Sequence, residues 1–175
     1  VLTDLGGIEH HRDKVVIATH ADDALGLLED PTSDEKRVLA SFDYSANETV
    51  LHTDASLLPD APGARASWNY RMDACGRREE STAVTYWMNR LQGIDSSRPY
   101  VVSLNSTDRI DPDTVLATMQ YTHPVYTPDS VAAQAELAGL NDGRTAFAGA
   151  YHGWGFHEDG CRSGVEAASS LGVSW

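Results

Sequence analysis

The chain has 175 residues, with 26 acidic and 13 basic side chains and a formal net charge of −13 at pH 7. Apolar residues make up 41% and charged residues 22%, a balance that is typical of folded domains and argues against disorder. Because an acidic surface repels phosphate backbones, nucleic acid is a poor partner. No window of about 18 apolar residues occurs, so we expect no transmembrane segment.

The first residues predict a hairpin that is entered midway. Val1–Thr3 and Glu9–Arg12 flank Gly6 and Gly7, as two strands flank a turn. The sequence lacks a leading Met and the basic head and apolar run of about 7–15 residues that mark a signal peptide. We therefore expect a cytoplasmic fragment, at most peripheral to a membrane, whose amino-terminal part is missing.

Residues 15–40 predict one buried strand and two short helices. Val15–Ala18 is a continuous apolar run, which is typical of a strand buried on both faces of a parallel sheet. Thr19–Leu28 follows as the first short helix. Thr32 or Ser33 together with Glu35 forms a capping box, which predicts the start of the second helix.

Between Phe42 and His123 the pattern changes to strand-like segments that alternate with polar turns. Short connections rich in Pro, Gly, Asp and Arg favour an antiparallel sheet. We expect its strands at residues 48–53, 66–70, 83–88, 100–104 and 114–123.

The remaining residues predict a helix, a short strand and a last helix. Thr127–Asp129 combines a cap, a proline at the first position and an acid in the first turn, which begins a helix to about Leu137. Arg144–Ala148 is the strand, and the last helix covers about Asp159–Leu171. Its core face is predicted to hold Val165, Ala168 and Leu171. The fold class is thus α/β (an α+β fragment), in which an antiparallel sheet interrupts an α/β layer.

Residues 147–168 carry the most informative pattern, a strand, a glycine-rich loop and a helix. Glycines at 149, 153, 155 and 160 allow a ligand to approach the backbone closely. The helix amino terminus adds unpaired N–H groups and the positive end of a dipole, which bind anions or polarised carbonyl oxygens. A strand-to-helix turn whose glycines are only steric is the alternative.

This segment resembles the terminal flavin-binding motif of the FAD-dependent amine oxidase and protoporphyrinogen oxidase superfamily. The matching pieces are Phe147–Gly149, Gly155–Phe156, Ser163–Gly164 and Ala167–Ala168. The chain is more closely similar to a bacterial group of predicted NAD/FAD-binding proteins, whose motifs it matches in order along nearly its whole length. Those motifs are VIATHAD at 16–22, ASWNY at 66–70, TYWMNRLQ at 85–92, HPV at 123–125 and GFHEDG at 155–160.

The resemblance implies an FAD-binding α/β domain with an inserted antiparallel-sheet substrate domain. Residues 1–40 and 139–175 would belong to the FAD-binding domain, and residues 41–138 to the substrate domain. The cofactor would be FAD, which accepts a hydride from a small-molecule or lipid-like substrate. The residues implied to bind FAD are Thr19, Gly149, Ala150, Gly155, Phe156, His157, Glu158, Asp159 and Gly160.

This sequence departs from the superfamily pattern in three places. Ala150 stands where many amine oxidases have Glu or Thr, and the loop Tyr151–Trp154 is shorter. The fingerprint G-x-G-x-x-G for the ADP moiety is absent, so the missing amino-terminal part would supply it. A flavin-dependent fatty-acyl desaturase is one alternative function, and a non-catalytic remnant or binding module is the other.

Three side chains are candidates for the substrate side, and none is predicted as catalytic. Trp68 and Tyr70, with Phe156 from the glycine-rich segment, offer aromatic surface and hydrogen bonds to a substrate. The alternative for Trp68 and Tyr70 is the core of the sheet. His123 is either a proton acceptor near the flavin or a core histidine.

The sequence predicts neither a metal site nor a disulfide. His152 and His157 lack the spacing of a pattern such as H-E-x-x-H. Two cysteines in a chain of this size, Cys75 and Cys161, favour free thiols in a reducing compartment. Cys161 is expected to pack the last helix.

Overall fold

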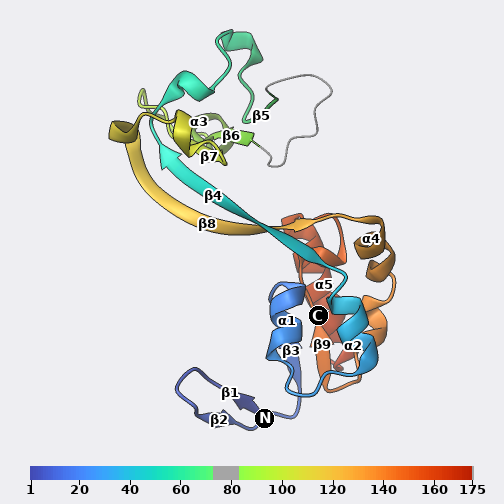
Figure 1. The fold of residues 1–175 in the computed structure, drawn as a ribbon. Coiled ribbons are helices and arrows are strands. Elements are labelled where there is room, and N and C mark those ends of the chain that lie inside the picture. Colours follow the sequence, from blue (N-terminus) through green and yellow to red (C-terminus); the bar gives the residue numbers. More distant parts are fainter. Residues whose placement is uncertain (73–82, 175) are drawn as a thin grey trace. The chain divides into compact units, whose positions relative to one another are not determined.

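The computed structural model describes residues 1–72 and 83–174, whose helices and strands are labelled in Figure 1. The chain divides into two compact units. The first unit joins Val1–Tyr44 to Pro124–Trp175, and the second is Ser45–His123. The described residues contain helices, a parallel strand pair and a mostly antiparallel larger sheet, which confirms the coarse prediction of a mixed α/β chain.

The first unit opens on the predicted hairpin. Strand β1 (Leu2–Thr3) pairs antiparallel with β2 (Glu9–His10). The Asp4 carboxylate accepts hydrogen bonds from the N–H groups of Gly6 at 2.9 Å and Ile8 at 3.0 Å. This side chain satisfies the backbone donors of the turn, as Asp does in many turns.

The centre of the first unit is a pair of parallel strands with helices on both faces. Strand β3 (Val15–Ile17) pairs in parallel with β9 (Thr145–Phe147). Because side chains alternate along a strand, Phe147 faces one side while Ala146 and Ala148 face the other. This layered arrangement is the α/β part that the apolar run of β3 predicted.

Each face of the parallel pair has its own core. Phe147 is fully buried in the larger core, where side chains of three helices meet. Those helices are α1 (Ala21–Leu27), α2 (Ser33–Leu39) and α4 (Pro128–Gln134). Ala146 and Ala148 pack against Ala167 and Leu171 at the last helix, α5 (His157–Ser170). The small alanines let α5 approach β9 closely.

The capping box at Thr32 is present and gives a first testable prediction. Thr32 Oγ1 accepts from the Glu35 N–H at 3.2 Å, and Glu35 Oε2 accepts from the Thr32 N–H at 2.7 Å. We expect Thr32→Ala to lower the free energy of unfolding by about 1 kcal/mol, because it removes an N-cap. The neighbouring Ser33→Ala, which leaves the box intact, is the control. Urea unfolding measures both, and equal effects would contradict the assignment of the cap.

The expected burial of β3 on both faces is wrong. Val16 is 39% exposed, although its neighbour Ile17 is buried. Val16 lies beside Ala146 in the register, yet the buried residues of this face come from β9 and α5 alone. Helix α5 therefore covers β9 and leaves the matching face of β3 open among the described residues.

Helix α5 begins earlier than predicted and turns a different face to the core. It starts at His157, and of the predicted face Leu171 is buried, whereas Val165 and Ala168 are only half-buried. The buried positions recur every fourth residue, at Asp159, Ser163, Ala167 and Leu171. Polar contacts of Asp159 and Ser163 with the preceding loop determine which face of the helix is buried. A pattern of apolar residues does not reveal such contacts, so it predicted a different face.

Helix α4 is shorter than predicted and belongs to the first unit. It ends at Gln134, and a 3-10 turn, η5 (Leu137–Leu140), continues the chain. Ala133 and Leu137 lie in the same core as Val38 of α2. The expected boundary at residue 138 had grouped this helix with the antiparallel sheet.

The second unit contains a five-stranded sheet in the order β5-β6-β7-β4-β8. The pairs β5 with β6, β6 with β7 and β7 with β4 are all antiparallel. All five strands lie where strand-like segments were predicted. They are β4 (Asp43–His52), β5 (Trp68–Arg71), β6 (Ala83–Trp87), β7 (Val101–Leu104) and β8 (Val115–Val125). β4 and β8 both continue across the boundary between the units.

A short helix that the sequence did not predict follows β6. β6 ends at Trp87, and α3 (Met88–Gln92) begins at once. Gly93 ends this helix in the left-handed conformation with φ 64°, which favours glycine. The predicted strand of residues 83–88 had included Met88, which is the first residue of this helix.

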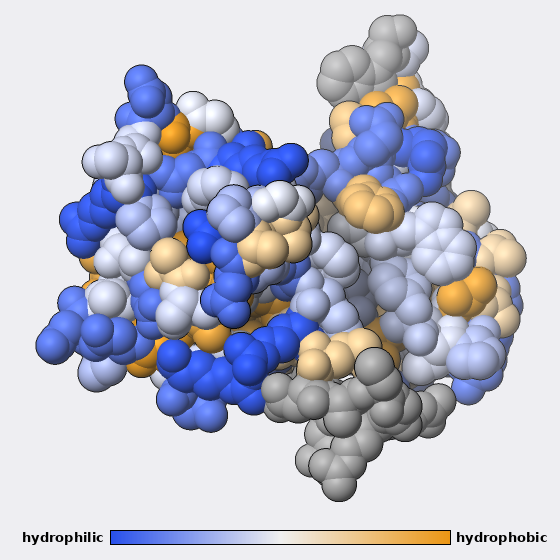
Figure 2. Space-filling view, turned by 90° about the horizontal axis from the view of Figure 1, so that it is seen from above, coloured by the Kyte–Doolittle hydropathy of each residue, from blue (hydrophilic) through white to orange (hydrophobic). Residues whose placement is uncertain are grey.

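One face of the molecule is mostly hydrophilic, and the described residues hold no spanning helix. On the face drawn in Figure 2, hydrophilic residues cover most of the surface and apolar residues form small separate areas. No helix in the described part of the chain is long and apolar enough to cross a membrane. By sequence, the first unit carries sixteen of the acidic side chains and six of the basic ones.

Candidate functional site

The carboxyl ends of the two parallel strands meet in the first unit. The Ala148 N–H donates to the carbonyl of Ile17, the last residue of β3, at 3.0 Å, which extends the pairing one residue past the end of β9. A Cβ added to Gly149 would lie 3.3 Å from the Thr19 carbonyl oxygen, so these two candidate residues are neighbours. In α/β folds, ligands bind outside the carboxyl ends of parallel strands.

The start of α5 lies at the same place. A Cβ on Gly160 would be 3.8 Å from the Ala150 nitrogen, so the first turn of the helix packs against the backbone after β9. Ser163 Oγ accepts from the Gly149 N–H at 2.9 Å and lies 2.8 Å from the Gly160 carbonyl, to which it donates. The structure thus brings Thr19, Gly149, Ala150 and Gly160 together.

Asp159 organises the loop before α5. Its carboxylate accepts from the N–H groups of Trp154 at 2.9 Å and Phe156 at 3.1 Å, and from Arg162 at 2.6 Å. Hydrogen bonds from the backbone, the Phe156 N–H first, hold the pKa of Asp159 below its usual value. An ionised carboxylate with these partners has a structural role in the loop and leaves little capacity for a ligand.

Two of the loop glycines make room for side chains of the chain itself. A Cβ on Gly149 would lie 2.4 Å from the Tyr151 ring, and a Cβ on Gly153 would lie 2.3 Å from the Asp159 carboxylate. At these two positions the glycines are needed to avoid clashes within the chain, as the alternative interpretation of the glycine-rich loop predicted. Gly155, with φ 86°, takes a backbone conformation that side chains rarely adopt.

Exposed aromatic side chains surround the beginning of α5. Phe156 is 68% exposed and Trp154 is 62% exposed. The Trp154 ring lies 5.6 Å from that of Tyr126, whose hydroxyl donates to the Gly153 carbonyl at 3.1 Å. Large exposed aromatics beside a helix terminus offer a flat apolar surface that a ring system can cover.

The first turn of α5 offers fewer donors than the sequence implied. The N–H groups of Asp159 and Gly160 already donate to the Phe156 carbonyl at 3.0 and 3.2 Å. His157 and Glu158 are exposed, and the first N–H groups of a helix have no partner within it. These two backbone donors are therefore the ones that a ligand at this end would meet.

Acidic side chains in the first turn of α1, which follows β3, make this region unfavourable for phosphate. His20, Asp22 and Asp23 bring one ligand-type atom each within 4.8 Å of one another, the single such group found among the described residues. The His20 ring also stacks on Tyr44 at 4.4 Å. Negative charge here disfavours an anion and tolerates a neutral ring.

Two buried polar atoms next to the loop have no hydrogen-bond partner in the described structure, the Tyr151 hydroxyl and His152 Nε2. Burial raises the pKa of Tyr151 above its usual value. Burial also lowers the pKa of His152 to about 4, so this imidazole is neutral near pH 7.

A pH dependence of stability follows from His152. In the unfolded chain this histidine binds a proton near its ordinary pKa of 6.5, whereas in the folded chain it does so only near 4. The unfolded state therefore binds more protons across this window, and stability falls as the pH drops from about 6.5 to about 4. We expect His152→Gln to flatten this part of the profile of unfolding free energy. His157→Gln, on an exposed histidine, is the control, and identical profiles for both variants would contradict the prediction.

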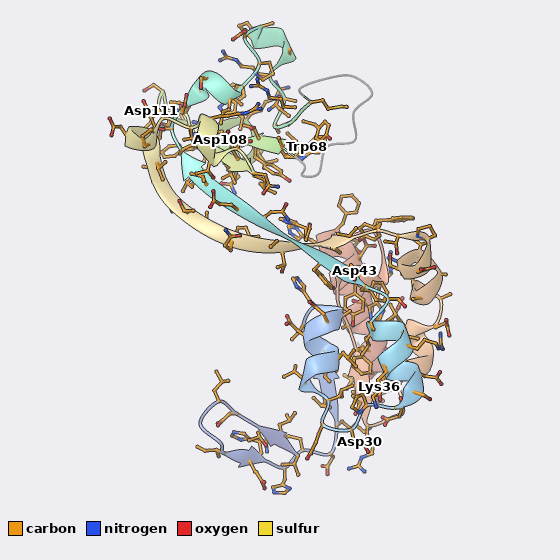
Figure 3. The ribbon with its side chains drawn as sticks, in the orientation of Figure 1. Asp30, Lys36, Asp43, Trp68, Asp108 and Asp111 are labelled. Atoms are coloured by element: carbon orange, nitrogen blue, oxygen red, sulfur yellow. The ribbon has the colours of Figure 1, made fainter. Side chains whose placement is uncertain are left out.

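The predicted substrate residues Trp68 and Tyr70 lie in the second unit, on the edge strand β5, and Figure 3 labels Trp68. Trp68 is 52% exposed and Tyr70 is 46% exposed, so the alternative of a sheet core is wrong. Their rings stack at 6.4 Å. They form an exposed aromatic stripe on one face of β5, which is the edge strand of the sheet among the described residues.

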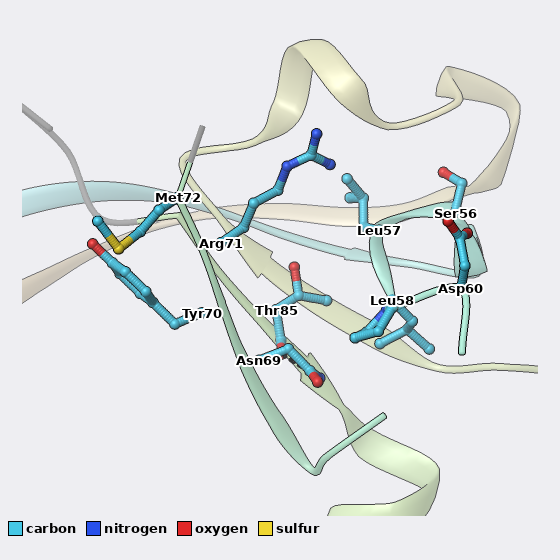
Figure 4. Close-up of a pocket in the computed structure, with 10 residues that line it drawn as sticks. Ser56, Leu57, Leu58, Asp60, Asn69, Tyr70, Arg71, Met72 and Thr85 are labelled. Carbon is cyan, nitrogen blue, oxygen red and sulfur yellow. Dashed lines mark hydrogen bonds between the residues drawn. The ribbon is translucent and has the colours of Figure 1, made fainter. Parts of the chain in front are cut away.

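Sequence reasoning missed a cavity of about 420 Å³ in the second unit. Figure 4 shows Arg71 and Thr85 facing the same space as Leu57 and Leu58. The signal was available, because strand alternation places Asn69 and Arg71 on the face opposite Trp68 and Tyr70. The lining residues are Ser56, Leu57, Leu58, Pro59, Asp60, Asn69, Tyr70, Arg71, Met72 and Thr85.

Two other expectations are corrected. The prediction of a core histidine at position 123 is wrong, because His123 is exposed. Its Nδ1 lies 3.0 Å from the Asn47 amide nitrogen. Cys161 is an exposed free thiol on α5 and does not pack the helix. Cys75 lies outside the described residues.

Comparisons with known proteins add no relative to this picture. No protein-family model matches the chain, and no curated protein matches it.

Proposed function

We propose that this chain supplies the isoalloxazine side of the flavin site, and a substrate-binding sheet, of an FAD-dependent oxidoreductase. One observation carries the proposal. The carboxyl ends of β3 and β9 and the amino end of α5 converge on Thr19, Gly149 and Ala150. Convergence of this kind is where α/β proteins bind cofactors, and it coincides with the segment that resembles a flavin-binding motif.

The residues at this end fit the ring end of FAD better than its pyrophosphate. Phe156 and Trp154 offer exposed aromatic surface, and His157 and Glu158 offer backbone donors. Asp22 and Asp23, in the first turn of α1, disfavour phosphate groups. No G-x-G-x-x-G occurs in the 175 residues, so the ADP moiety would bind to sequence outside them.

Bound FAD would supply hydride acceptance from a C–N or C–C bond of the substrate. The backbone N–H groups of His157 and Glu158 would stabilise negative charge on the pyrimidine side of the ring, as preorganised donors do. Ser163 holds the Gly149 backbone in place, and Asp159 fixes the loop that carries Phe156. Phe156 would shield one side of the ring from water.

A more specific reaction is supported by the aromatic stripe on β5. Trp68, Tyr70 and Met72 are all about half exposed and alternate along one face of the edge strand. An apolar stripe of this kind suits a hydrocarbon chain. It favours desaturation of a fatty-acyl substrate over oxidation of a small polar amine.

A non-catalytic binding module is the second candidate function. The space beside Gly149 and Gly153 is filled by Tyr151 and Asp159 of the same chain, which supports a purely structural loop. Under this candidate the loop and α5 would keep the fold without touching a flavin.

Phe156 provides the test that separates the two candidates. In the protein at its natural length we expect Phe156→Ala to weaken FAD binding about two- to tenfold, because an aromatic contact contributes about 0.5–1.5 kcal/mol. Leu5→Ala is the control, since Leu5 is fully exposed on the hairpin. Quenching of flavin fluorescence measures both affinities. Equal affinities of Phe156→Ala and the unchanged protein would contradict a flavin at the start of α5.

A further inference from the structure

The cavity of about 420 Å³ in the second unit has one buried polar side chain among the described residues that line it. This residue is Thr85 of β6, which is 6% exposed. Figure 4 shows its side chain facing the space beside Leu57 and Leu58, which form an apolar wall. A buried hydroxyl binds a ligand only through a proton or a lone pair that the protein leaves free.

The other polar side chains of the described lining are engaged within the protein or face the solvent. Asn69 Oδ1 accepts from the Ala66 N–H at 3.0 Å, and its amide nitrogen donates to the carbonyls of Ala66 at 2.8 Å and Thr85 at 3.3 Å. Arg71 already interacts with another part of the chain, so we assign it no contact with a ligand. The remaining side chains are exposed, and they are Ser56, Asp60 and Tyr70.

Thr85 is the end of a buried chain of hydrogen bonds that crosses three strands. Its hydroxyl lies 3.1 Å from that of Ser103 on β7, and the Ser103 hydroxyl lies 2.9 Å from His52 Nε2 on β4. Ser103 and His52 are fully buried. The antiparallel register places the three side chains on one face of the sheet. The direction of these hydrogen bonds decides whether Thr85 offers the cavity a donor or an acceptor.

The backbone of Asp54 sets the direction of these hydrogen bonds. Its N–H donates to His52 Nδ1 at 3.2 Å, and burial lowers the pKa of His52, so the imidazole is neutral and carries its proton on Nε2. Nε2 therefore donates to Ser103 and is no base toward it. Ser103 donates to Thr85, since a buried donor without a partner is unfavourable. Thr85 accepts this bond, so its own O–H is left for the cavity.

A carbonyl oxygen is the ligand group that fits this single donor. It accepts a hydrogen bond and brings no donor of its own that would need a partner. A carboxylate fits less well, because neutral His52 at the far end of the chain of hydrogen bonds supplies no positive charge to replace the lost hydration. The acid Asp60 on the lining also disfavours an anion.

We propose that this cavity binds a small neutral molecule in which a ketone or ester carbonyl is joined to an apolar group. The carbonyl oxygen would accept the Thr85 O–H, and the apolar group would contact Leu57 and Leu58. His52 and Ser103 are positioning residues, because they act only by directing the Thr85 hydroxyl. The inference does not depend on a flavin, since every residue in it belongs to the second unit.

Benzylacetone, a methyl ketone with a phenyl group, is the probe, and the ¹⁵N-labelled full chain is the protein. The control is the amine with the same carbon skeleton, which is a cation near neutral pH and only donates hydrogen bonds. We expect the ketone to cause saturable shifts of the amide signals of β5, β6 and residues 56–60, and the amine to bind there about tenfold more weakly. Equal or tighter binding of the amine, or no saturable ketone shifts at these residues, would overturn the proposal.

The Thr85 hydroxyl is tested with a matched pair of substitutions. Thr85→Val removes the O–H and keeps the shape, so the affinity for benzylacetone should fall about two- to tenfold, as for the loss of one hydrogen bond. Thr85→Ser keeps the O–H and should bind the ketone as tightly as the unchanged protein. The same amide shifts measure all three affinities. Unchanged affinity in Thr85→Val, or an equal loss in both variants, would contradict the proposal.

The tautomer of His52 is a readout that needs no substitution. Two-bond ¹H–¹⁵N correlations of the imidazole should show Nε2 protonated and Nδ1 without a proton. The reverse tautomer would make Nε2 an acceptor and direct the hydroxyl protons of Ser103 and Thr85 away from the cavity. That result would overturn the proposal even if Thr85→Val failed to fold.

Discussion

Replacing Phe147 with alanine should lower the free energy of unfolding of the first unit by about 3–5 kcal/mol. Phe147 is fully buried on β9, in the core that joins α1, α2 and α4. Its removal leaves a cavity between elements that cannot all move inward, because the parallel pairing with β3 fixes the strand. Urea unfolding followed by circular dichroism measures the change.

Phe156→Ala is the matched control, because it makes the same chemical change nine positions along the chain. Phe156 is 68% exposed, so its loss should change stability by less than about 0.5 kcal/mol. A similar loss of stability in the two variants would contradict the placement of Phe147 in the core and of Phe156 at the surface.

Gly149→Ala should destabilise the first unit by about 1–3 kcal/mol, because it overpacks a closed site. The new methyl group would lie 2.4 Å from the Tyr151 ring. That ring is 3% exposed and contacts Phe42 edge-on at 5.2 Å, so it has little room to move away. The Thr19 carbonyl at 3.3 Å closes the other side.

Gly164→Ala is the control for this substitution. Gly164 lies inside α5, and a Cβ there would meet nothing within 4 Å. Alanine should stabilise the helix by about 0.5–1 kcal/mol, because it loses less backbone entropy than glycine. Thermal unfolding of the two variants should therefore shift in opposite directions. A shift in the same direction would contradict the close packing at Gly149.

Local signals in the sequence were sufficient for most elements. The capping box at Thr32, the cap and proline at Thr127 and Pro128, the Gly6–Gly7 turn and the apolar run of β3 each depend on neighbouring residues, and each predicted its element. Their chemistry is contained in a few consecutive side chains, which explains why pattern reasoning succeeded.

Contacts between distant residues could not be predicted in this way. The buried face of α5 depends on the hydrogen bond between Ser163 and the Gly149 N–H. The place of α4 in the first unit depends on its packing against Val38. The hydrogen bonds that link the side chains of His52 and Thr85 require the register of three strands. No local pattern contains that register, so strand alternation alone could not show that this face of β5 lines a cavity.

The sequence predicted which residues belong to the candidate flavin site, but it did not predict how they are arranged. Thr19, Gly149, Ala150 and Gly160 do lie together. The roles of Gly153 and Asp159 differ, because the carboxylate fills the space beside the glycine and caps the loop. The spacing of the glycines indicates that the backbone needs free space beside it, but it does not show whether a ligand or a side chain fills that space.

The absorption spectrum of the protein at its natural length, purified and then mixed with FAD, tests the central proposal most directly. The proposal predicts that the two visible bands of oxidised flavin remain with the protein after gel filtration and that substrate bleaches them, since the flavin accepts a hydride. A protein that is folded and emerges from the column without these bands would contradict a flavin-dependent oxidoreductase.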